Sequence, residues 1–586
     1  MEKWFLKKRN FWPEELQKEF DIPLFLAEIL ARRDLKSKEE IKNYLKRSRS
    51  CEHSPFLFKD MDKAVDLLLE KKQKGEKFLL SLDYDVDGII SGAVSYLGLQ
   101  KLGFDCECIF PHRVSDGYGI NNRIVQYAID NKFGTIVTFD NGIAAFDAID
   151  FAKENGIDVI VTDHHEVPQI LLNEKEEDEL VDALAIINPH QKLCDYPYPD
   201  ICGAAIAYKL VLAINLAMGY EENHLSDIYP LVAIATICDV MNLVDENRIF
   251  VHYGLNALQD IHNLGLKALM QALGIERTPT VYDIGFRIGP CFNSSGRLSS
   301  AEKAFELLIE TDSGKATALA EELITLNRER KQLTIDATQK AIQIVEEKQL
   351  FKNNIILLKL EDVHESLVGI IAGRLKDRYQ VPVIVFAVSE DFYKGSARSV
   401  EEVNIFEVLS TFKKYFLKFG GHAMAAGLSV SMENFDAFEK EIIAQMNALE
   451  LSHEHTFLID NVASFDILSM ELLRTCNLFE PMGKGNPELL FSSKDVKIKN
   501  MTLLGEKKNV LRLDLISNQI VKSFVSFSPE KILEKIKNKL DLSPERDIIG
   551  MPANELQSIS FDILFKMGIN HFKGNEYLNL ELISIR

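Results

Sequence analysis

Four short motifs rich in Asp and His constrain the fold of this chain, because each follows an apolar stretch of mostly aliphatic or β-branched residues. Such stretches are typical of buried parallel strands, whose carboxyl ends share one crevice in an open α/β sheet. We therefore expect a doubly wound parallel sheet whose strand ends bring the motifs together. The residues are Asp83, Asp85 and Asp87 in DYDVDG, Asp140 in TFDNG, Asp163, His164 and His165 in IVTDHH, and Asp239 in ATICDV.

The ligand types in these motifs indicate a hard divalent cation. Carboxylate oxygens with one or two imidazoles suit Mn²⁺ or Mg²⁺ better than zinc, and two such ions are typical of phosphoester hydrolases. Taken singly, each Asp is equally typical of a turn or a helix cap. DYDVDG also begins like a calcium loop, but the twelfth position from Asp83 is Val94 instead of Glu. The agreement of four motifs in type and place favours a two-metal phosphoesterase.

The spacing of the three Asp residues in DYDVDG predicts a common orientation. Alternate residues lie on one face of a strand, and Gly88 would permit the turn from that strand into a helix. Asp83, Asp85 and Asp87 are then expected to fan around the same crevice.

Strand-like and helix-like patterns alternate between about residues 55 and 250, as in a parallel α/β sheet. The alternation is the reason for assigning this region to one sheet domain. The expected strands are 78–82, 107–110, 135–139, 159–162 and 183–187, and the expected helices are 89–101, 122–131, 144–154 and 204–218.

The rest of the chain divides into helical and β-rich parts. Residues 254–310 have a helical pattern around a GPCFNSSGRL loop. Residues 316–348 contain no Gly or Pro and would span about 50 Å as one helix, which favours a connector over an isolated coiled coil. A second α/β unit follows, and the short strands after residue 455 are compatible with an OB-type barrel. The expected domains are a helical extension packed on the next domain (1–54), the sheet domain with its helical tail (55–310), the connector (311–350), the second α/β domain (351–452) and the barrel (453–586).

The net charge of the chain limits the ways in which it could bind nucleic acid. The formal net charge of −21 argues against duplex binding through a broad basic coat, although ions held in a carboxylate site are not counted in it. Part of the negative charge lies in residues 174–179, which are expected to form a solvated loop or helix face. Any path for DNA must then be a confined basic groove.

Cysteine usage and hydropathy indicate the compartment. The eight cysteines include no CxxC pair, and Cys106 and Cys108 alternate within a strand pattern typical of packed thiols. This usage favours a reduced cytoplasm, and no segment approaches the length of a membrane span. We expect a cytoplasmic protein that does not enter the membrane.

The four motifs together resemble those of the DHH phosphoesterase superfamily. Within it, nearly the whole chain is similar to the RecJ family of bacterial single-strand-specific DNA exonucleases. The similarity includes the N-terminal segment beginning MEKWFLKKRNFWPEELQKEF. It continues in FPHRVSDGYGI (110–120), GPCFNSSGRL (289–298), KGSARS (394–399) and FGGHAMAAG (419–427).

The resemblance implies roles for the metal-site residues. Asp83 and Asp85 would hold a first cation, and Asp140 would bridge this cation and a second one. Pyrophosphatases of the superfamily carry His at the position of Asp83. The second cation would be held by Asp87, His164 and Asp239. His165 would face the substrate, binding the scissile phosphate or protonating the leaving 3′ oxygen, while Asp163 would orient a histidine.

Further motifs resemble readers of phosphate and backbone. KGSARS offers a hydroxyl, Gly-permitted backbone amides and an Arg whose fork suits phosphate. The resemblance implies that Ser396, Arg398 and Arg297 grip the 5′ side of the strand. Arg113 and Tyr118 would contact the backbone or stack on a base, and His422 would lie beside the scissile phosphate. The glycines of FGGHAMAAG are also compatible with a tight turn that begins a helix.

The resemblance implies a 5′→3′ exonuclease on single-stranded DNA that releases 5′-mononucleotides in DNA repair and recombination. The expected partners are single-stranded DNA, single-strand-binding protein and a helicase, and the expected state is a monomer. The alternatives are a short-oligonucleotide or cyclic-dinucleotide phosphodiesterase, an inorganic pyrophosphatase and a non-catalytic replication scaffold. Length and the segment after residue 455 disfavour the first two, and the complete set of ligands disfavours the scaffold.

Overall fold

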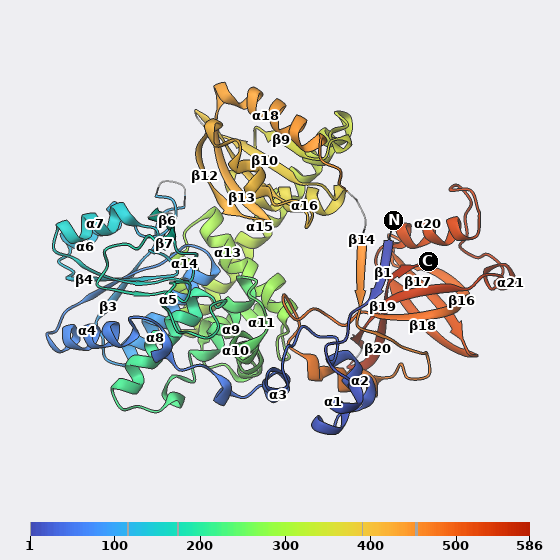
Figure 1. The fold of residues 1–586 in the computed structure, drawn as a ribbon, viewed down its shortest axis with the longest axis horizontal. Coiled ribbons are helices and arrows are strands. Elements are labelled where there is room, and N and C mark those ends of the chain that lie inside the picture. Colours follow the sequence, from blue (N-terminus) through green and yellow to red (C-terminus); the bar gives the residue numbers. More distant parts are fainter. Residues whose placement is uncertain (1, 114–115, 173–174, 390, 452–454, 573) are drawn as a thin grey trace. The chain divides into compact units, whose positions relative to one another are not determined.

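The computed structural model describes residues 2–113, 116–172, 175–389, 391–451, 455–572 and 574–586. They form two compact units. Figure 1 shows their helices and strands. The first unit consists of Leu264–Ala272 and Pro290–His455. The second consists of Glu2–Asn263, Leu273–Gly289 and Thr456–Arg586.

The second unit contains the expected doubly wound sheet. Its strands run parallel in the order β3–β2–β4–β5–β8. Leu79 and Ile136 belong to the core beneath α6 and α7, while α4, α5 and α8 pack together on the opposite face (Figure 1). The bounds are β2 (Phe78–Ser81), β3 (Cys106–Ile109), β4 (Thr135–Phe139), β5 (Asp158–Thr162), β8 (Ala185–Ile187), α4 (Met61–Gln73), α5 (Val86–Lys101), α6 (Asn122–Asp130), α7 (Phe146–Glu154) and α8 (Gly203–Ala217).

The acidic stretch 174–179 is not the loop or helix face that was expected. Most of it forms strand β7 (Lys175–Asp178), which pairs antiparallel with β6 (Gln169–Leu172). Glu174 lies outside the described residues. A two-stranded ribbon is held by backbone hydrogen bonds, so an acidic stretch can form one of its strands.

The GPCFNSSGRL segment is helix α13 (Gly289–Leu298) instead of the expected loop. Ser295 donates its hydroxyl to the carbonyl of Phe292, so the polar side chain is satisfied within the helix. Phe292 is fully buried and anchors the helix. The other helical elements between residues 229 and 309 are α9 (Tyr229–Cys238), α10 (Asp245–Ala257), α11 (Leu264–Ala272), α12 (Val281–Asp283), a π-helical turn (Ile284–Ile288) and α14 (Glu302–Ile309).

The first unit combines the long helix with a five-stranded sheet. Helix α15 (Ser313–Glu347) spans most of residues 311–350, where one long connector helix was expected. In the sheet, β9 is parallel to β10 and all other pairs are antiparallel, in the order β12–β13–β11–β10–β9. The bounds are β9 (Ile356–Leu360), β10 (Val383–Val388), β11 (Phe392–Arg398), β12 (Phe416–His422), β13 (Ala425–Ser431), α16 (Val368–Tyr379), α17 (Ile405–Ser410) and α18 (Met432–Asn447).

The C-terminal strands close into the expected barrel. The order β16–β17–β18–β20–β19 is completed by pairing between β16 and β19, and β15 adds to β16 outside the ring. The bounds are β14 (His455–Ile459), β15 (Asn461–Val462), β16 (Phe491–Leu504), β17 (Val510–Ser517), β18 (Ile520–Ser526), β19 (Phe561–Phe572), β20 (Asn575–Ile585), α19 (Met470–Cys476), α20 (Pro529–Lys539) and α21 (Ala553–Leu556).

The N-terminal extension shares the core of this barrel domain, and its helix α3 (Lys38–Lys46) also contacts α10 of the sheet domain, on which we expected the extension to pack. Leu16, Leu30 and Ile41 lie in one apolar cluster with Phe491 and Phe565. The elements are β1 (Glu2–Leu6), which pairs with β14, and the helices α1 (Pro13–Phe20), α2 (Leu24–Leu30) and α3 (Lys38–Lys46).

Within the described ranges, no helix combines the length and the apolar character needed to cross a bilayer.

Candidate metal centre

The DYDVDG motif leaves β2 and begins helix α5. The Asp85 carboxylate caps that helix by accepting from the amide of Gly88 at 3.1 Å, and Asp87 lies in its first turn. Gly88 is therefore inside the helix and not at the predicted turn. A Cβ there would come within 2.5 Å of the Asp83 carbonyl oxygen, so the absent side chain permits close packing.

Asp140 directly follows strand β4, and Asp163 directly follows strand β5. Asp140 has φ of 63°, a left-handed conformation that Asp tolerates better than most residues. The buried Asp163 accepts from the amides of Ile143, His164 and His165 and from Nδ1 of His165 at 2.7 Å. Both oxygens of Asp163 therefore already accept hydrogen bonds, and the bond to Nδ1 holds the ring of His165 in its orientation.

We expected Asp239 to follow a strand. The structure instead has Asp239 as the cap at the carboxyl end of helix α9. The apolar run before it is helical because that segment is buried on all sides among other helices. Nε2 of His164 lies 3.8 Å from Asp239, 3.7 Å from Asp87 and 3.2 Å from Asp140. Ligands from two strand ends and two helix ends thus converge.

The converging side chains form three overlapping groups in which the ligand atoms lie within 4.8 Å of one another. Both carboxylate oxygens of Asp83 and Oδ1 of Asp140 are buried and have no hydrogen-bond partner among the described residues. Buried carboxylates without donors are costly unless a cation binds them. The donor set fits Mn²⁺ or Mg²⁺. The groups are Asp83–Asp85–Asp140, Asp87–His164–Asp239 and Asp140–His164–His165.

The pKa values reflect this crowding. Burial and the neighbouring Asp85 charge raise the pKa of Asp87 to about 7, and burial also raises the pKa of Asp83, Asp140 and Asp239. Burial and the charge of His165 lower the pKa of His164 to about 3, which keeps it neutral as a ligand must be.

His165 behaves in the opposite way. Burial works against its protonation, but the hydrogen bond and charge of Asp163 raise its pKa to about 9. Burial in turn opposes ionisation of Asp163, while the hydrogen bond from His165 lowers the pKa of that carboxyl. In the metal-free centre these shifts favour a carboxylate at Asp163 and a protonated imidazole at His165.

Helix α8 contributes contacts that the sequence did not predict. The amides of Gly203 and Ala204 donate to Asp87 at 2.6 and 2.9 Å, and a Cβ at Gly203 would lie 2.6 Å from Oδ1 of Asp140. Positive helix ends favour carboxylates, so α8 supports the ionised form of Asp87. The sequence signal that could have indicated these contacts is Gly203 at the start of a long apolar helix.

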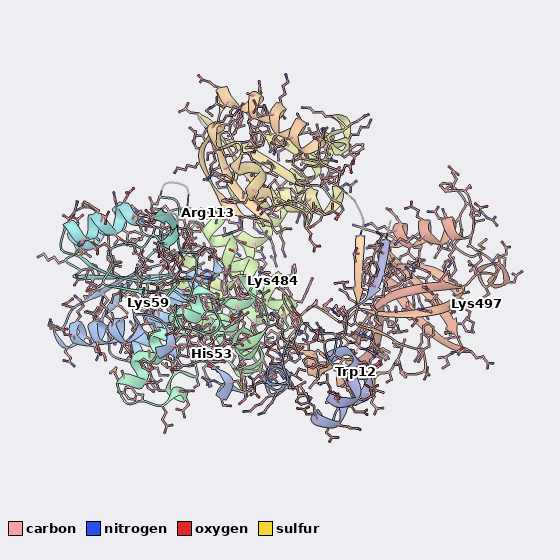
Figure 2. The ribbon with its side chains drawn as sticks, viewed as in Figure 1. Trp12, His53, Lys59, Arg113, Lys484 and Lys497 are labelled. Carbon is pink, nitrogen blue, oxygen red and sulfur yellow. The ribbon has the colours of Figure 1, made fainter. Side chains whose placement is uncertain are left out.

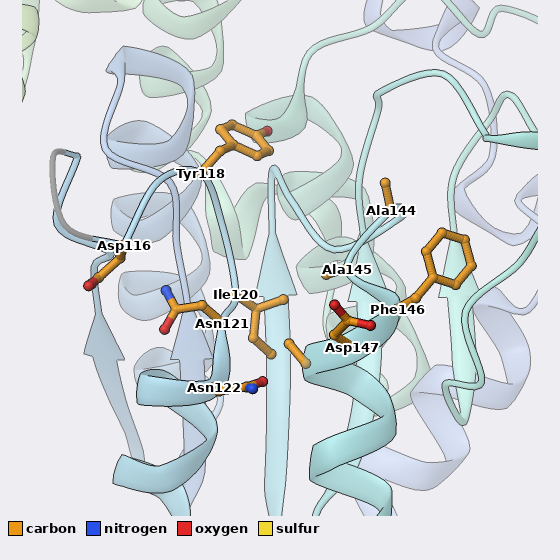
Figure 3. Close-up of a pocket in the computed structure, with 10 residues that line it drawn as sticks. Asp116, Tyr118, Ile120, Asn121, Asn122, Ala144, Ala145, Phe146 and Asp147 are labelled. Atoms are coloured by element: carbon orange, nitrogen blue, oxygen red, sulfur yellow. The ribbon is translucent and has the colours of Figure 1, made fainter. Parts of the chain in front are cut away.

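Tyr118 lies beside the metal centre, at the edge of a hollow of roughly 470 Å³ (Figure 3). Its hydroxyl donates to the carbonyl of Asp140 at 2.5 Å and lies 3.2 Å from the ring nitrogens of His165. Arg113 stacks over Tyr84 at 4.6 Å. The hollow lies between the starts of α6 and α7, where Asp116, Asn121, Asn122, Phe146 and Asp147 also line it.

The other predicted substrate residues belong to the first unit. KGSARS lies in strand β11, where the Arg398 guanidinium donates to the Ser396 hydroxyl at 2.9 Å. Gly369, near the start of α16, would carry a Cβ 2.9 Å from Nη2 of Arg398, so its small size leaves space for that side chain. Arg297 donates to the carbonyl of Ser366 at 2.6 Å.

FGGHAMAAG does not begin a helix. It forms the β12–β13 hairpin, in which Gly421 pairs with Ala426. Gly421 has φ of 153°, and a Cβ there would lie 2.5 Å from the backbone of Ala425 and Ala426, so the hairpin depends on glycine. His422 ends β12 and is exposed.

Comparison with known proteins is consistent with this architecture. Family models for the DHH family N-terminal domain, the DHHA1 domain and the RecJ OB domain match residues 77–236, 352–448 and 459–584. The single-stranded-DNA-specific exonuclease RecJ of Haemophilus influenzae is 34% identical over 547 residues, covering 89% of both chains. That of Salmonella typhimurium is 30% identical and covers 96% of this chain and 95% of its own.

Solved structures share the fold. RecJ from Thermus thermophilus in complex with Mn²⁺ aligns with a TM-score of 0.79 at 24% identity, covering 100% of this chain and 79% of its own. An exonuclease RecJ bound to manganese aligns with a TM-score of 0.57 at 30% identity, covering 67% of this chain and 96% of its own. The fold, the ligand cluster and the extent of sequence identity together show that this chain belongs to the RecJ family of the DHH phosphoesterases.

Proposed function

We propose that the protein is a single-strand-specific DNA exonuclease that hydrolyses phosphodiester bonds from the 5′ end and releases 5′-mononucleotides in DNA repair and recombination. The observation that carries the proposal is the cluster of ligand groups in which both oxygens of Asp83 and Oδ1 of Asp140 are buried without donors, in a chain that matches RecJ proteins over nearly its whole length. Incubation with Mn²⁺ and 5′-labelled single strand, duplex, dinucleotide or pyrophosphate tests it. Selective release of labelled mononucleotide from the single strand is expected. Preference for the dinucleotide would instead indicate a short-oligonucleotide phosphodiesterase.

The ligand groups support two cation positions. Asp83 and Asp85 would hold one cation, and the group Asp87–His164–Asp239 the other, while Asp140 would bridge them. Bound there, two divalent cations would stabilise charge on a phosphate and lower the pKa of a water ligand.

The chain's own residues complete the site. His165, held by Asp163 and protonated at neutral pH, would donate a hydrogen bond to the scissile phosphate or a proton to the leaving 3′ oxygen. Tyr118 would keep His165 in place and present its ring to the adjacent nucleotide. Arg113 would add a positive charge near Asp83. His422 would lie beside the scissile phosphate.

Polarity requires groups that recognise one chain end, and Ser396, Arg398 and Arg297 would bind the 5′ phosphate. Burial lowers the pKa of Arg398, and among the described residues no carboxylate oxygen lies within 4 Å of its guanidinium. A half-buried guanidinium without an acidic partner is suited to bind an anion.

Arg398→Ala should slow cleavage of a 5′-phosphorylated strand about 10- to 150-fold and of a 5′-hydroxyl strand less, because a charge-assisted hydrogen bond to the terminal phosphate is lost. Initial rates at subsaturating DNA measure this. Arg378→Ala, on the exposed side of α16 where Arg378 pairs with Glu346, is the control. Equal loss on both strands would make Arg398 a general backbone contact.

We further propose that the protein works as a cytoplasmic monomer on single strands supplied with the help of single-strand-binding protein and a helicase. None of the eight cysteines forms a disulfide bond, which supports a reduced compartment. Mass measurement in solution and co-purification with these proteins test the proposal.

A further inference from the structure

A tight turn of the C-terminal domain carries a lysine at its tip. The backbones of Gly483 and Asn486 exchange hydrogen bonds of 2.9 and 3.2 Å, which leaves Lys484 and Gly485 as the two central residues. Gly485 has φ of 72°, as the third position of a type II turn requires. The buried Asn486 side chain anchors the turn by donating to the carbonyls of Phe479 and Pro481.

This turn is seated against the loop that follows the metal-site residue Asp239. The amide of Leu243 donates to the carbonyl of Lys484 at 2.7 Å. A Cβ at Gly483 would lie 2.7 Å from the Leu243 side chain, and one at Gly485 would lie 2.9 Å from Cβ of Asn242. The two glycines therefore let the turn approach the loop closely, and Lys484 is held beside the loop that follows Asp239.

The side chain of Lys484 is exposed and keeps its charge available. Among the described residues, no carboxylate oxygen lies within 4 Å of its Nζ. Leu243, whose amide donates to the carbonyl of Lys484, lies four residues after Asp239 in the chain. The turn therefore brings the ammonium group of Lys484 to the loop that follows Asp239.

We propose that Lys484 binds a phosphate oxygen of the DNA strand at the metal centre, so that the C-terminal domain contributes directly to the active site. The inference rests on the proposed nuclease function. A DNA strand that approaches the five carboxylates of the ligand groups would be repelled, and an ammonium on a rigid turn offsets that repulsion locally. When a cation binds Asp239, that carboxylate is not available to Lys484, and we expect the lysine to bind the phosphates of the DNA strand instead.

The test compares Lys484→Gln, Lys484→Arg and Lys497→Gln with the wild type on a 5′-phosphorylated tetranucleotide. Lys497 is exposed on β16 of the same domain, well apart from Lys484 in Figure 2. The short substrate limits contacts with the barrel. Steady-state kinetics at several salt concentrations give KM, kcat and the salt dependence, and isothermal titration of the metal-free protein with Mn²⁺ gives the affinity of the centre.

Lys484→Gln should raise KM about three- to thirtyfold and reduce the salt slope by about 0.7, the value for one phosphate contact on a single strand. Lys484→Arg should restore most of the loss, and Lys497→Gln should match the wild type. Mn²⁺ should bind Lys484→Gln as tightly as the wild type or more tightly, since a neighbouring positive charge is removed.

Two results would overturn the proposal. Equal kinetics of Lys484→Gln and Lys497→Gln would place Lys484 outside the substrate path. Weaker Mn²⁺ binding with a lower kcat and an unchanged salt slope would show that the residue only supports the loop of Asp239. A wild type without activity on single strands would contradict the proposed function instead, which keeps the two failures distinguishable.

Discussion

At the scale of single residues, the metal centre concentrates negative charge in the protein interior. Asp83, Asp87 and Asp140 are almost completely buried and lie close to Asp85 and Asp239. Like charges at this separation repel each other strongly when water is excluded, so the empty centre is expected to destabilise the fold. A cation reverses the sign of that contribution.

Asp140→Asn should therefore lower kcat about a thousandfold or more, because Asp140, the one carboxylate that belongs to two of the ligand groups, loses its charge. The same change should raise the melting temperature in EDTA, since one repelling carboxylate is removed. Asn also tolerates the left-handed backbone at this position. Asp150→Asn on the exposed side of α7 is the control, and it should change neither quantity. Residual activity above a few per cent at saturating Mn²⁺ would contradict the bridging role.

The stability of the metal-free protein should increase as the pH falls from about 8.5 to 7. The folded state raises the pKa of Asp87 to about 7, and also raises that of Asp83, Asp140 and Asp239, while unfolded Asp titrates near 3.9. The folded state thus binds more protons in this window, which gives stability that is lost as the pH rises. Melting curves in EDTA measure it. With Mn²⁺ the trend should invert, because protons then compete with the metal.

At the scale of elements, the start of α8 sets the position of two ligands at once. Its first amides bind Asp87, and the missing side chain of Gly203 makes room for Asp140. A helix start is rigid because its hydrogen bonds continue into the helix, so a displacement there moves both carboxylates together.

Gly203→Ala should reduce kcat about a hundredfold by displacing Asp140, since misplacement of about 1 Å is enough for such a loss. Circular dichroism should remain unchanged. Gly373→Ala makes the same substitution inside α16, where a Cβ would meet nothing within 4 Å, and it should stabilise the protein by about 0.5–1 kcal/mol without slowing the reaction. Similar effects of both changes would show that helix propensity, and not the position of Asp140, explains the loss.

At the scale of the whole molecule, the second unit joins the two ends of the chain. Lys7 pairs with Asp460 at 2.7 Å, and Tyr44 donates to Asn486 at 3.0 Å. The buried Arg248 of α10 donates to the carbonyls of Tyr44, Leu478, Phe479 and Pro481, which ties the sheet domain to the same junction.

Removing residues 456–586 alone should leave an insoluble protein, because the apolar face of residues 11–45 loses its partners. Removing residues 1–48 as well should restore solubility. Gel filtration and light scattering of the two truncations measure this. A soluble, monomeric product of the single truncation would show that the N-terminal helices find another partner.

Much of the architecture follows from local sequence. The strands at 78–82 and 135–139 are apolar runs whose side chains can only be buried between two layers of helices, and an Asp directly after such a run must lie at the sheet edge. Asp83, Asp140 and the two histidines could therefore be predicted. The barrel likewise follows from short alternating strands after residue 455.

Other features depend on contacts that no local pattern encodes. The apolar run before Asp239 is compatible with either a strand or a helix, and burial among helices decided for the helix. The amide of Gly203 meets Asp87 across 116 residues, and Tyr44 meets Asn486 across 442. The sequence by itself determined the ligand types and the sheet, because strand burial and turn chemistry act over a few residues. The tertiary structure alone decided which helix ends, termini and turns complete the centre, because those contacts form only when distant surfaces pack together.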